Sequence, residues 1–173
     1  MRIDSWWITD VGKKRDHNED SLLCLPDINL YVVADGMGGH RAGDIASRLA
    51  VETIEQVLRN ALPMTLDAPK RGTMLFFSQP RDPVVQLLTQ AVQAASSAIL
   101  DAVEKDPELS GMGTTVSGLF FIDDQATYMH IGDSRIYQLS DGLLTRITTD
   151  HSFVQEQVDA GLLSQAEAQQ SRF

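Results

Sequence analysis

The stretch that decides the fold is YVVADGMGGH, residues 31–40. An apolar run typical of a strand ends on Asp35 and passes directly into a glycine-rich segment. An ordinary turn explains this pattern if Asp35 only caps the turn. The alternative is a ligand site, because the sheet would fix the direction of the carboxylate while Gly36, without a Cβ, lets its carbonyl approach the same ligand.

A second polar cluster, RDHNED at residues 15–20, directly precedes a predicted strand. Glu19 and Asp20 point to opposite faces if this segment is extended, so one can reach a cation while the other anchors the turn. Divalent cations such as magnesium take oxygen ligands, and a cation offsets the repulsion between gathered carboxylates. The planar guanidinium of Arg15 suits bidentate contact with a phosphate. The candidate site consists of Arg15, Glu19, Asp20, Asp35 and Gly36.

Composition limits the class of protein. The chain has 173 residues, 43% of them hydrophobic, which fits one globular domain. Its net charge of -10 argues against nucleic-acid or anionic-membrane partners, and no apolar run predicts a membrane span. The single cysteine, Cys24, excludes an internal disulfide and indicates a reducing, cytoplasmic location. An acidic protein handles phosphate only if cations intervene.

Periodicity predicts the order of elements. Helical spacing runs over 42–62, and Asp82-Pro83 begins a second helix that ends near Lys105. Residues 63–82, with three prolines, predict a surface excursion. Capping-box spacing from Ser164 predicts a helix start after the helical SFVQEQVDAGLL segment. The predicted strands are 3–9, 20–25 and 29–34, followed by an antiparallel meander of 114–122, 126–131, 134–139 and 143–148.

Other polar residues have more ordinary interpretations. We expect Asp133, Ser134 and Arg135, between two strands of the meander, to lock it through side-chain bonds rather than act on a substrate. His17, His130 and His151 lack the spacing of metal ligands. These residues are therefore not assigned to the candidate site.

Five segments in order resemble the successive motifs of the metal-dependent (PPM, or type 2C) Ser/Thr protein phosphatases, the bacterial single-domain members most of all. They are TDVGKKRDHNED, VVADGMGGHRAG, SGMGTTVSGLFF, MHIGDSRIYQL and TTDHSFVQEQVDAG. The resemblance runs from about Thr9 to Gly161. It implies an α+β fold, a four-layer αββα sandwich of two antiparallel sheets flanked by helices.

The resemblance also implies hydrolysis of phosphoserine and phosphothreonine in proteins by a water between two Mn²⁺ or Mg²⁺ ions. Asp35 matches the bridging aspartate, and Gly36 matches a glycine whose carbonyl binds one ion. Glu19 and Asp20 match the acidic pair that binds metal or metal-bound water, and Arg15 matches the phosphate-binding arginine. The implied partners are phosphorylated proteins, with a Ser/Thr kinase acting in opposition. The sequence does not predict the oligomeric state.

The chain departs from the family pattern at three places. Met37 stands where many relatives have a histidine proposed as general acid, so the leaving seryl oxygen must take its proton from water or another group. Ser110 stands where many members place an aspartate for a third ion, which argues against a third ion here. The family pattern continues with two further metal-binding aspartates that nothing here matches. We therefore expect residues 1–173 to be a single PPM-type phosphatase domain that lacks its C-terminal segment.

Two other functions remain as alternatives. A catalytically weak or inactive phosphatase-like module would keep the fold as a regulator or binding protein. A nucleotide-binding protein could use GMGG as its phosphate loop. However, the dinucleotide motif requires glycine at position 41, which is arginine, and the Lys-Ser/Thr ending of a P-loop is also missing.

Overall fold

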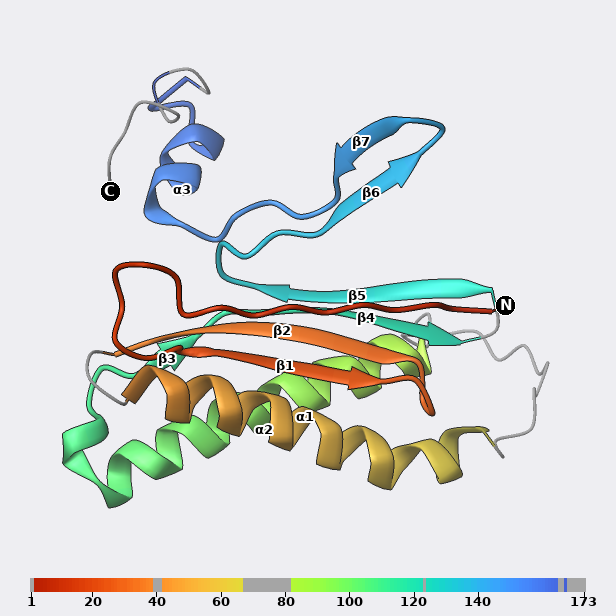
Figure 1. Cartoon of the computed structure of the whole chain (residues 1–173), viewed down its shortest axis with the longest axis horizontal. Coiled ribbons are helices and arrows are strands. Elements are labelled where there is room, and N and C mark those ends of the chain that lie inside the picture. Colours follow the sequence, from red (N-terminus) through yellow and green to blue (C-terminus); the bar gives the residue numbers. More distant parts are fainter. Residues whose placement is uncertain (1, 39–41, 67–81, 123, 165–166, 168–173) are drawn as a thin grey trace, which may run out of the picture.

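The computed structural model describes residues 2–38, 42–66, 82–122, 124–164 and 167. One antiparallel sheet has two long helices packed against one face (Figure 1). Its main strands lie in the order β1-β2-β4-β5, with the short β3 paired to the end of β2. The elements are β1 (Asp20–Leu25), β2 (Leu30–Met37), α1 (Ala42–Leu66), α2 (Pro83–Lys105), β3 (Gly113–Thr114), β4 (Val116–Ile122) and β5 (Gln125–Ile131). The fold is α+β, as the sequence predicts.

The core lies between the sheet and the two helices. Along β2, Leu30, Val32 and Ala34 are buried at 0%, 3% and 2% exposure, whereas the residues between them are more exposed. This alternation follows from the period of two in a strand, which places every second side chain on the helix face. Ile54 and Leu58 of α1, both 0% exposed, complete this layer. Burying each of the four larger side chains, Leu30, Val32, Ile54 and Leu58, contributes about 1.5–3 kcal/mol to folding.

The helix boundaries follow their sequence signals. The Asp82 side chain accepts a hydrogen bond of 2.8 Å from the Val84 amide, and α2 runs from Pro83 to Lys105 as predicted. At the other end of the chain, the Ser164 hydroxyl accepts from the Glu167 amide at 3.2 Å, which is the predicted capping-box contact. Helix α1 continues to Leu66, beyond the predicted end at 62. The rest of the predicted excursion, residues 67–81, lies outside the described residues.

The strand predicted at 3–9 is wrong. The described residues from 2 to 11 form no strand, and none of them pairs with a strand of either sheet. This segment instead runs extended across the sheet, with its Ser5 hydroxyl 3.5 Å from the Cys24 sulfur (Figure 1). Trp6 and Trp7 are 88% and 66% exposed. The apolar residues that suggested a strand are therefore surface residues among the described part of the chain.

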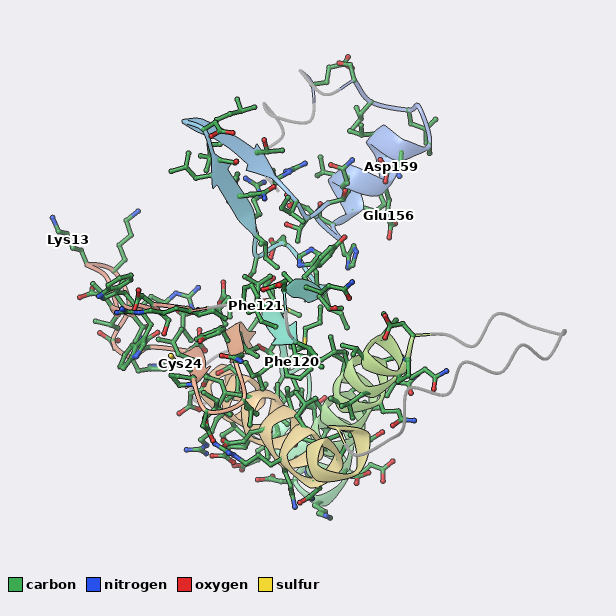
Figure 2. The ribbon with its side chains drawn as sticks, turned by 90° about the vertical axis from the view of Figure 1, so that its right-hand side faces the viewer. Lys13, Cys24, Phe120, Phe121, Glu156 and Asp159 are labelled. Carbon is green, nitrogen blue, oxygen red and sulfur yellow. The ribbon has the colours of Figure 1, made fainter. Side chains whose placement is uncertain are left out.

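The predicted meander is divided into two sheets. Strand β6 (Tyr137–Ser140) pairs with β7 (Leu143–Arg146) in a separate hairpin and not with β5. The chain turns away after β5 at Gly132, whose φ is +100°, a value that favours glycine. The hairpin and α3 (Phe153–Asp159) lie on the side of the sheet away from α1 and α2 (Figure 2).

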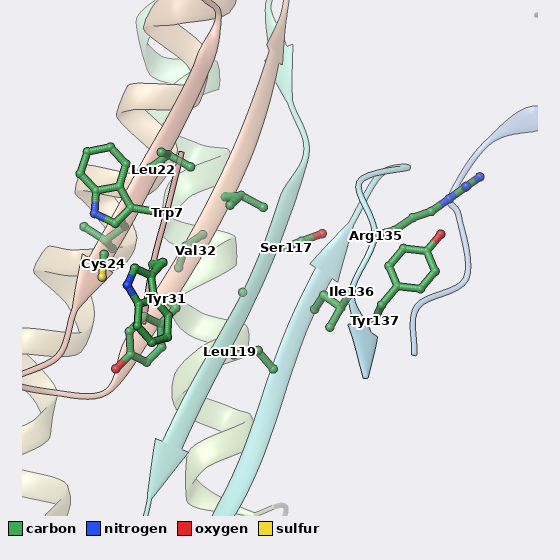
Figure 3. Close-up of a pocket in the computed structure, with 14 residues that line it drawn as sticks. Trp7, Leu22, Cys24, Tyr31, Val32, Ser117, Leu119, Arg135, Ile136 and Tyr137 are labelled. Atoms are coloured by element: carbon green, nitrogen blue, oxygen red, sulfur yellow. The ribbon is translucent and has the colours of Figure 1, made fainter. Parts of the chain in front are cut away.

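The sheet face opposite the helices is partly open. A hollow of about 290 Å³ lies between the N-terminal segment, the sheet and the start of β6 (Figure 3). Its walls include Trp7, Leu22, Tyr31, Leu119 and Tyr137. None of the helices in the described part of the chain is long and apolar enough to cross a membrane.

Candidate metal and phosphate site

Two carboxylates from separate strands meet on the open face of the sheet. In the antiparallel pairing of β1 with β2, Asp20 lies directly opposite Asp35. Directly opposed residues point to the same face, with Cβ atoms about 4.5–5.5 Å apart. Both residues line a hollow of about 240 Å³ together with Thr9 and Ser134. The structure therefore brings Asp20 and Asp35 together, as the sequence predicts.

The electrostatic environment of Asp35 favours a bound cation. Partial burial is the largest cause that raises the pKa of the Asp35 carboxyl, followed by the negative charges of Asp20 and Asp133. Glu19 raises this pKa as well, whereas Arg15 lowers it. A divalent ion between the carboxylates would offset this repulsion. The Asp20–Asp35 pair is therefore chemically suited to be part of the ligand set of a divalent metal.

Asp133 belongs to this acidic group, although the sequence indicated a structural role. The sequence places Asp133 in a turn between two strands. It does not indicate which other strand that turn approaches. Only the fold shows that its charge acts on Asp35.

Glu19 lies on the other face of the sheet, next to the start of α1. Its side chain is 7% exposed and forms an ion pair with Arg15. A Cβ added to Gly43, in the first turn of α1, would lie 2.6 Å from Glu19 Oε1. The positive end of a helix dipole favours a carboxylate at this position. Glu19 therefore anchors the turn while Asp20 faces Asp35, which is one of the arrangements that the sequence allowed.

Gly36 is needed for packing. A Cβ at this position would collide with the carbonyl oxygen of Gly43 and would lie 2.6 Å from the carbonyl oxygen of Glu19. The Gly36 amide donates a hydrogen bond of 3.1 Å to that same Glu19 oxygen. The sequence suggested a different reason, access of the Gly36 carbonyl to an ion, and that role stays a prediction.

Arg15 lies at the rim of the acidic group. Its side chain is 67% exposed, and its charge lowers the pKa of Asp35. The ion pair with Glu19 holds one end of the guanidinium and leaves the rest of its planar fork at the surface. This arrangement suits contact with a phosphate that arrives from solvent.

The described residues supply few candidate ligands for a metal. No group of three or more His, Cys, Asp or Glu side chains among them could hold an ion. Magnesium and similar ions are often held by one or two carboxylates, with water completing the coordination. Asp20 and Asp35 provide two such carboxylates. Ser110, which stands where many family members place an aspartate for a third ion, is the C-cap of the short helix Pro107–Leu109.

The loop of residues 132–135 is fastened to the segment before α3. Arg135 donates to Asp150 from Nη2 at 2.6 Å and from Nε at 3.0 Å, and the His151 amide donates to the Gly132 carbonyl at 2.7 Å. This confirms that Arg135 locks the chain through side-chain bonds. The same bonds hold the loop that carries Asp133 against the segment of residues 150–151.

The ion pair of Arg135 with Asp150 gives a prediction about stability. The Arg135 guanidinium lowers the pKa of the Asp150 carboxyl, so the pair contributes stability above the ordinary carboxyl pKa and loses it as the pH falls below that value. We expect Asp150→Asn to lower the free energy of unfolding by about 1 kcal/mol at pH 7, because Arg135 is half exposed. In urea titrations, the free energies of unfolding of the variant and the wild type should become equal at acid pH. A difference that persists at acid pH would contradict the assignment.

Comparison with known proteins identifies the family. The family model described as Protein phosphatase 2C matches residues 13–171. Serine/threonine protein phosphatase PstP of Mycobacterium tuberculosis is 39% identical over 160 residues, which are 92% of this chain and 27% of that protein. Serine/threonine phosphatase stp of Listeria monocytogenes is 34% identical over 163 residues, 92% of this chain and 59% of its own length.

A solved structure agrees with these relatives. The catalytic domain of PstP in complex with two manganese ions has a TM-score of 0.68 and 40% identity, covering 91% of this chain and 60% of that domain. The chain thus spans less than two thirds of each of these relatives, 27%, 59% and 60% of their lengths. The match to the family model nevertheless extends over nearly all of the sequence, and the chain belongs to the protein phosphatase 2C family.

Proposed function

We propose that this chain forms the greater part of one phosphatase domain that hydrolyses phosphoserine and phosphothreonine in cytoplasmic proteins and opposes a Ser/Thr kinase. The observation that carries the proposal is the pairing of Asp20 with Asp35 in a polar hollow beside Arg15. The relative crystallised with two manganese ions supports the same chemistry.

Each residue has a separate task in this proposal. Asp35 and Asp20 would hold Mn²⁺ or Mg²⁺, with the Gly36 carbonyl as a further ligand. The bound metal would supply a water of lowered pKa, oriented for in-line attack on phosphorus. Arg15 binds the phosphoryl oxygens, and Glu19 holds Arg15 in place through their ion pair.

The leaving group takes its proton from water in this proposal. Met37, 67% exposed at the end of β2, has no proton to donate. A solvent-open site supplies water at this position, so no titratable side chain is needed there.

The test is hydrolysis of a phosphothreonine peptide with and without manganese. Arg15→Ala should lower kcat/KM by roughly 10- to 100-fold, because a hydrogen bond between charged groups is lost. Arg15→Lys should recover part of this loss, since it keeps the charge without the fork. Arg59→Ala is the matched control, because Arg59 pairs with Asp27 and Glu55 on the outside of α1.

The outcomes separate the alternatives. Hydrolysis that persists in excess chelator would contradict the metal-dependent mechanism. Manganese binding without turnover would favour the inactive binding module. Equal kcat/KM values for Arg15→Ala and Arg59→Ala would remove Arg15 from the site.

A further inference from the structure

The hydroxyl of Thr115 connects Asp35 to the loop of residues 132–135. The Asp35 amide donates to Thr115 Oγ1 at 3.0 Å, and the Thr115 amide donates to the Asp35 carbonyl at 2.9 Å. Thr115 Oγ1 also lies 2.7 Å from Ser134 Oγ. Thr115 Oγ1 accepts from the Asp35 amide, and either hydroxyl can be the donor in its bond with Ser134. Thr115 therefore joins two segments that are far apart in the sequence.

The loop also packs directly on Thr115. A Cβ added to Gly132 would lie 2.6 Å from Thr115 Cγ2, so the close contact requires glycine. Ser134, the hydroxyl partner of Thr115, lines the same hollow as Asp20 and Asp35. Thr115 thus defines where the loop meets the end of β2.

The far side of the loop has its own contacts. Besides the bonds to Asp150 and His151, the buried Ser117 hydroxyl donates to the Ser134 carbonyl at 3.4 Å. These bonds hold the loop on the side away from Thr115. The contact of Thr115 with Ser134 then determines how close Asp133, one residue before Ser134, comes to Asp35.

We propose that Thr115 is a positioning residue, whose hydroxyl holds Asp35 and the 132–135 loop at a fixed spacing and thereby sets the geometry of the acidic group. Removal of the hydroxyl leaves the Asp35 amide and Ser134 Oγ without this partner. The consequence for metal binding rests on the proposed function, whereas the connection between the two segments does not.

The first experiment measures the connection without metal, by amide hydrogen exchange. Thr115→Val should speed exchange in residues 34–36 and in 132–136 by roughly tenfold, the equivalent of one lost hydrogen bond. Ser134→Ala should speed exchange in 132–136, and adding it to Thr115→Val should have little further effect there, because both remove the same contact. Thr115→Ser should restore protection. Thr145→Val, on the exposed strand β7, is the control.

The second experiment measures manganese binding by electron paramagnetic resonance. We expect Thr115→Val to weaken binding by roughly 10- to 100-fold and Thr115→Ser to remain close to wild type. Exchange in 132–136 that is unchanged in Thr115→Val would overturn the proposal. If the wild type binds manganese, an unchanged affinity in Thr115→Val would overturn it as well. If the wild type binds no manganese, the proposed function fails, and the exchange data alone decide whether Thr115 connects the two segments.

Discussion

Asp35→Asn should abolish manganese binding and, at the same time, stabilise the metal-free protein. The pKa of Asp35 is raised, chiefly by burial and by the charges of Asp20 and Asp133. For an acid whose pKa is higher in the folded state, stability is greatest below the unfolded pKa and falls as the pH rises through the folded pKa. An uncharged asparagine avoids this loss at neutral pH. It also removes a carboxylate that we propose as a metal ligand.

Thermal melts with and without manganese measure both effects. Wild type with manganese at 100 times its Kd should gain about 2.7 kcal/mol, or roughly 5–10 °C in Tm for a chain of this size. The variant should melt higher than wild type without metal at pH 7 and should gain nothing from manganese. The difference in Tm between the metal-free variant and the metal-free wild type should disappear as the pH falls below the ordinary carboxyl pKa, about 3.9.

A matched variant makes the result specific. Asp27→Asn removes a carboxylate that is paired with Arg59 on the surface, so it should not stabilise the metal-free protein or change the response to manganese. An Asp35→Asn protein that still gains Tm from manganese, or that still hydrolyses the phosphothreonine peptide in a manganese-dependent way, would refute the assigned role of Asp35.

Local signals in the sequence predicted the residues that face each other across neighbouring strands. The bounds of β1, 20–25, and of α2, 83–105, follow from periodicity and capping alone. The opposite directions of Glu19 and Asp20 follow from the period of two in an extended chain. Once β1 and β2 form a hairpin, the register that places Asp20 opposite Asp35 is limited to few choices.

Contacts between distant segments could not be predicted in the same way. The approach of Asp133 to Asp35, and the contact of Thr115 with Ser134, depend on how the chain returns after β5. The segment 3–9 has the composition of a strand, but strand formation requires a partner that composition does not reveal. The sequence marks Gly36 as a candidate site residue, but its packing against Gly43 depends on how α1 lies on the sheet.

That packing gives the second large prediction, that Gly36→Ala destabilises the fold by about 3 kcal/mol or more. The added methyl group would meet backbone atoms of Gly43 and Glu19, and no side-chain rotation can relieve such a collision. Helix α1 would have to move away from β2. This movement would open the core where Ala34 and Ala46 are buried at 2% and 0% exposure.

Urea titrations of Gly36→Ala and Gly12→Ala separate this packing effect from the general cost of replacing a glycine. Gly12 has a φ of +74°, but nothing lies within 4 Å of an added Cβ, so its replacement should cost only about 1–2 kcal/mol for the left-handed backbone. The loss of stability in Gly43→Ala should lie between those of Gly36→Ala and Gly12→Ala, because the added Cβ would meet the movable carboxyl group of Glu19. It should also disturb the ion pair with Arg15 and so weaken phosphate binding. If Gly36→Ala were no more destabilising than Gly12→Ala, the first turn of α1 could not lie against Gly36, and the position of Glu19 beside that turn would be wrong as well.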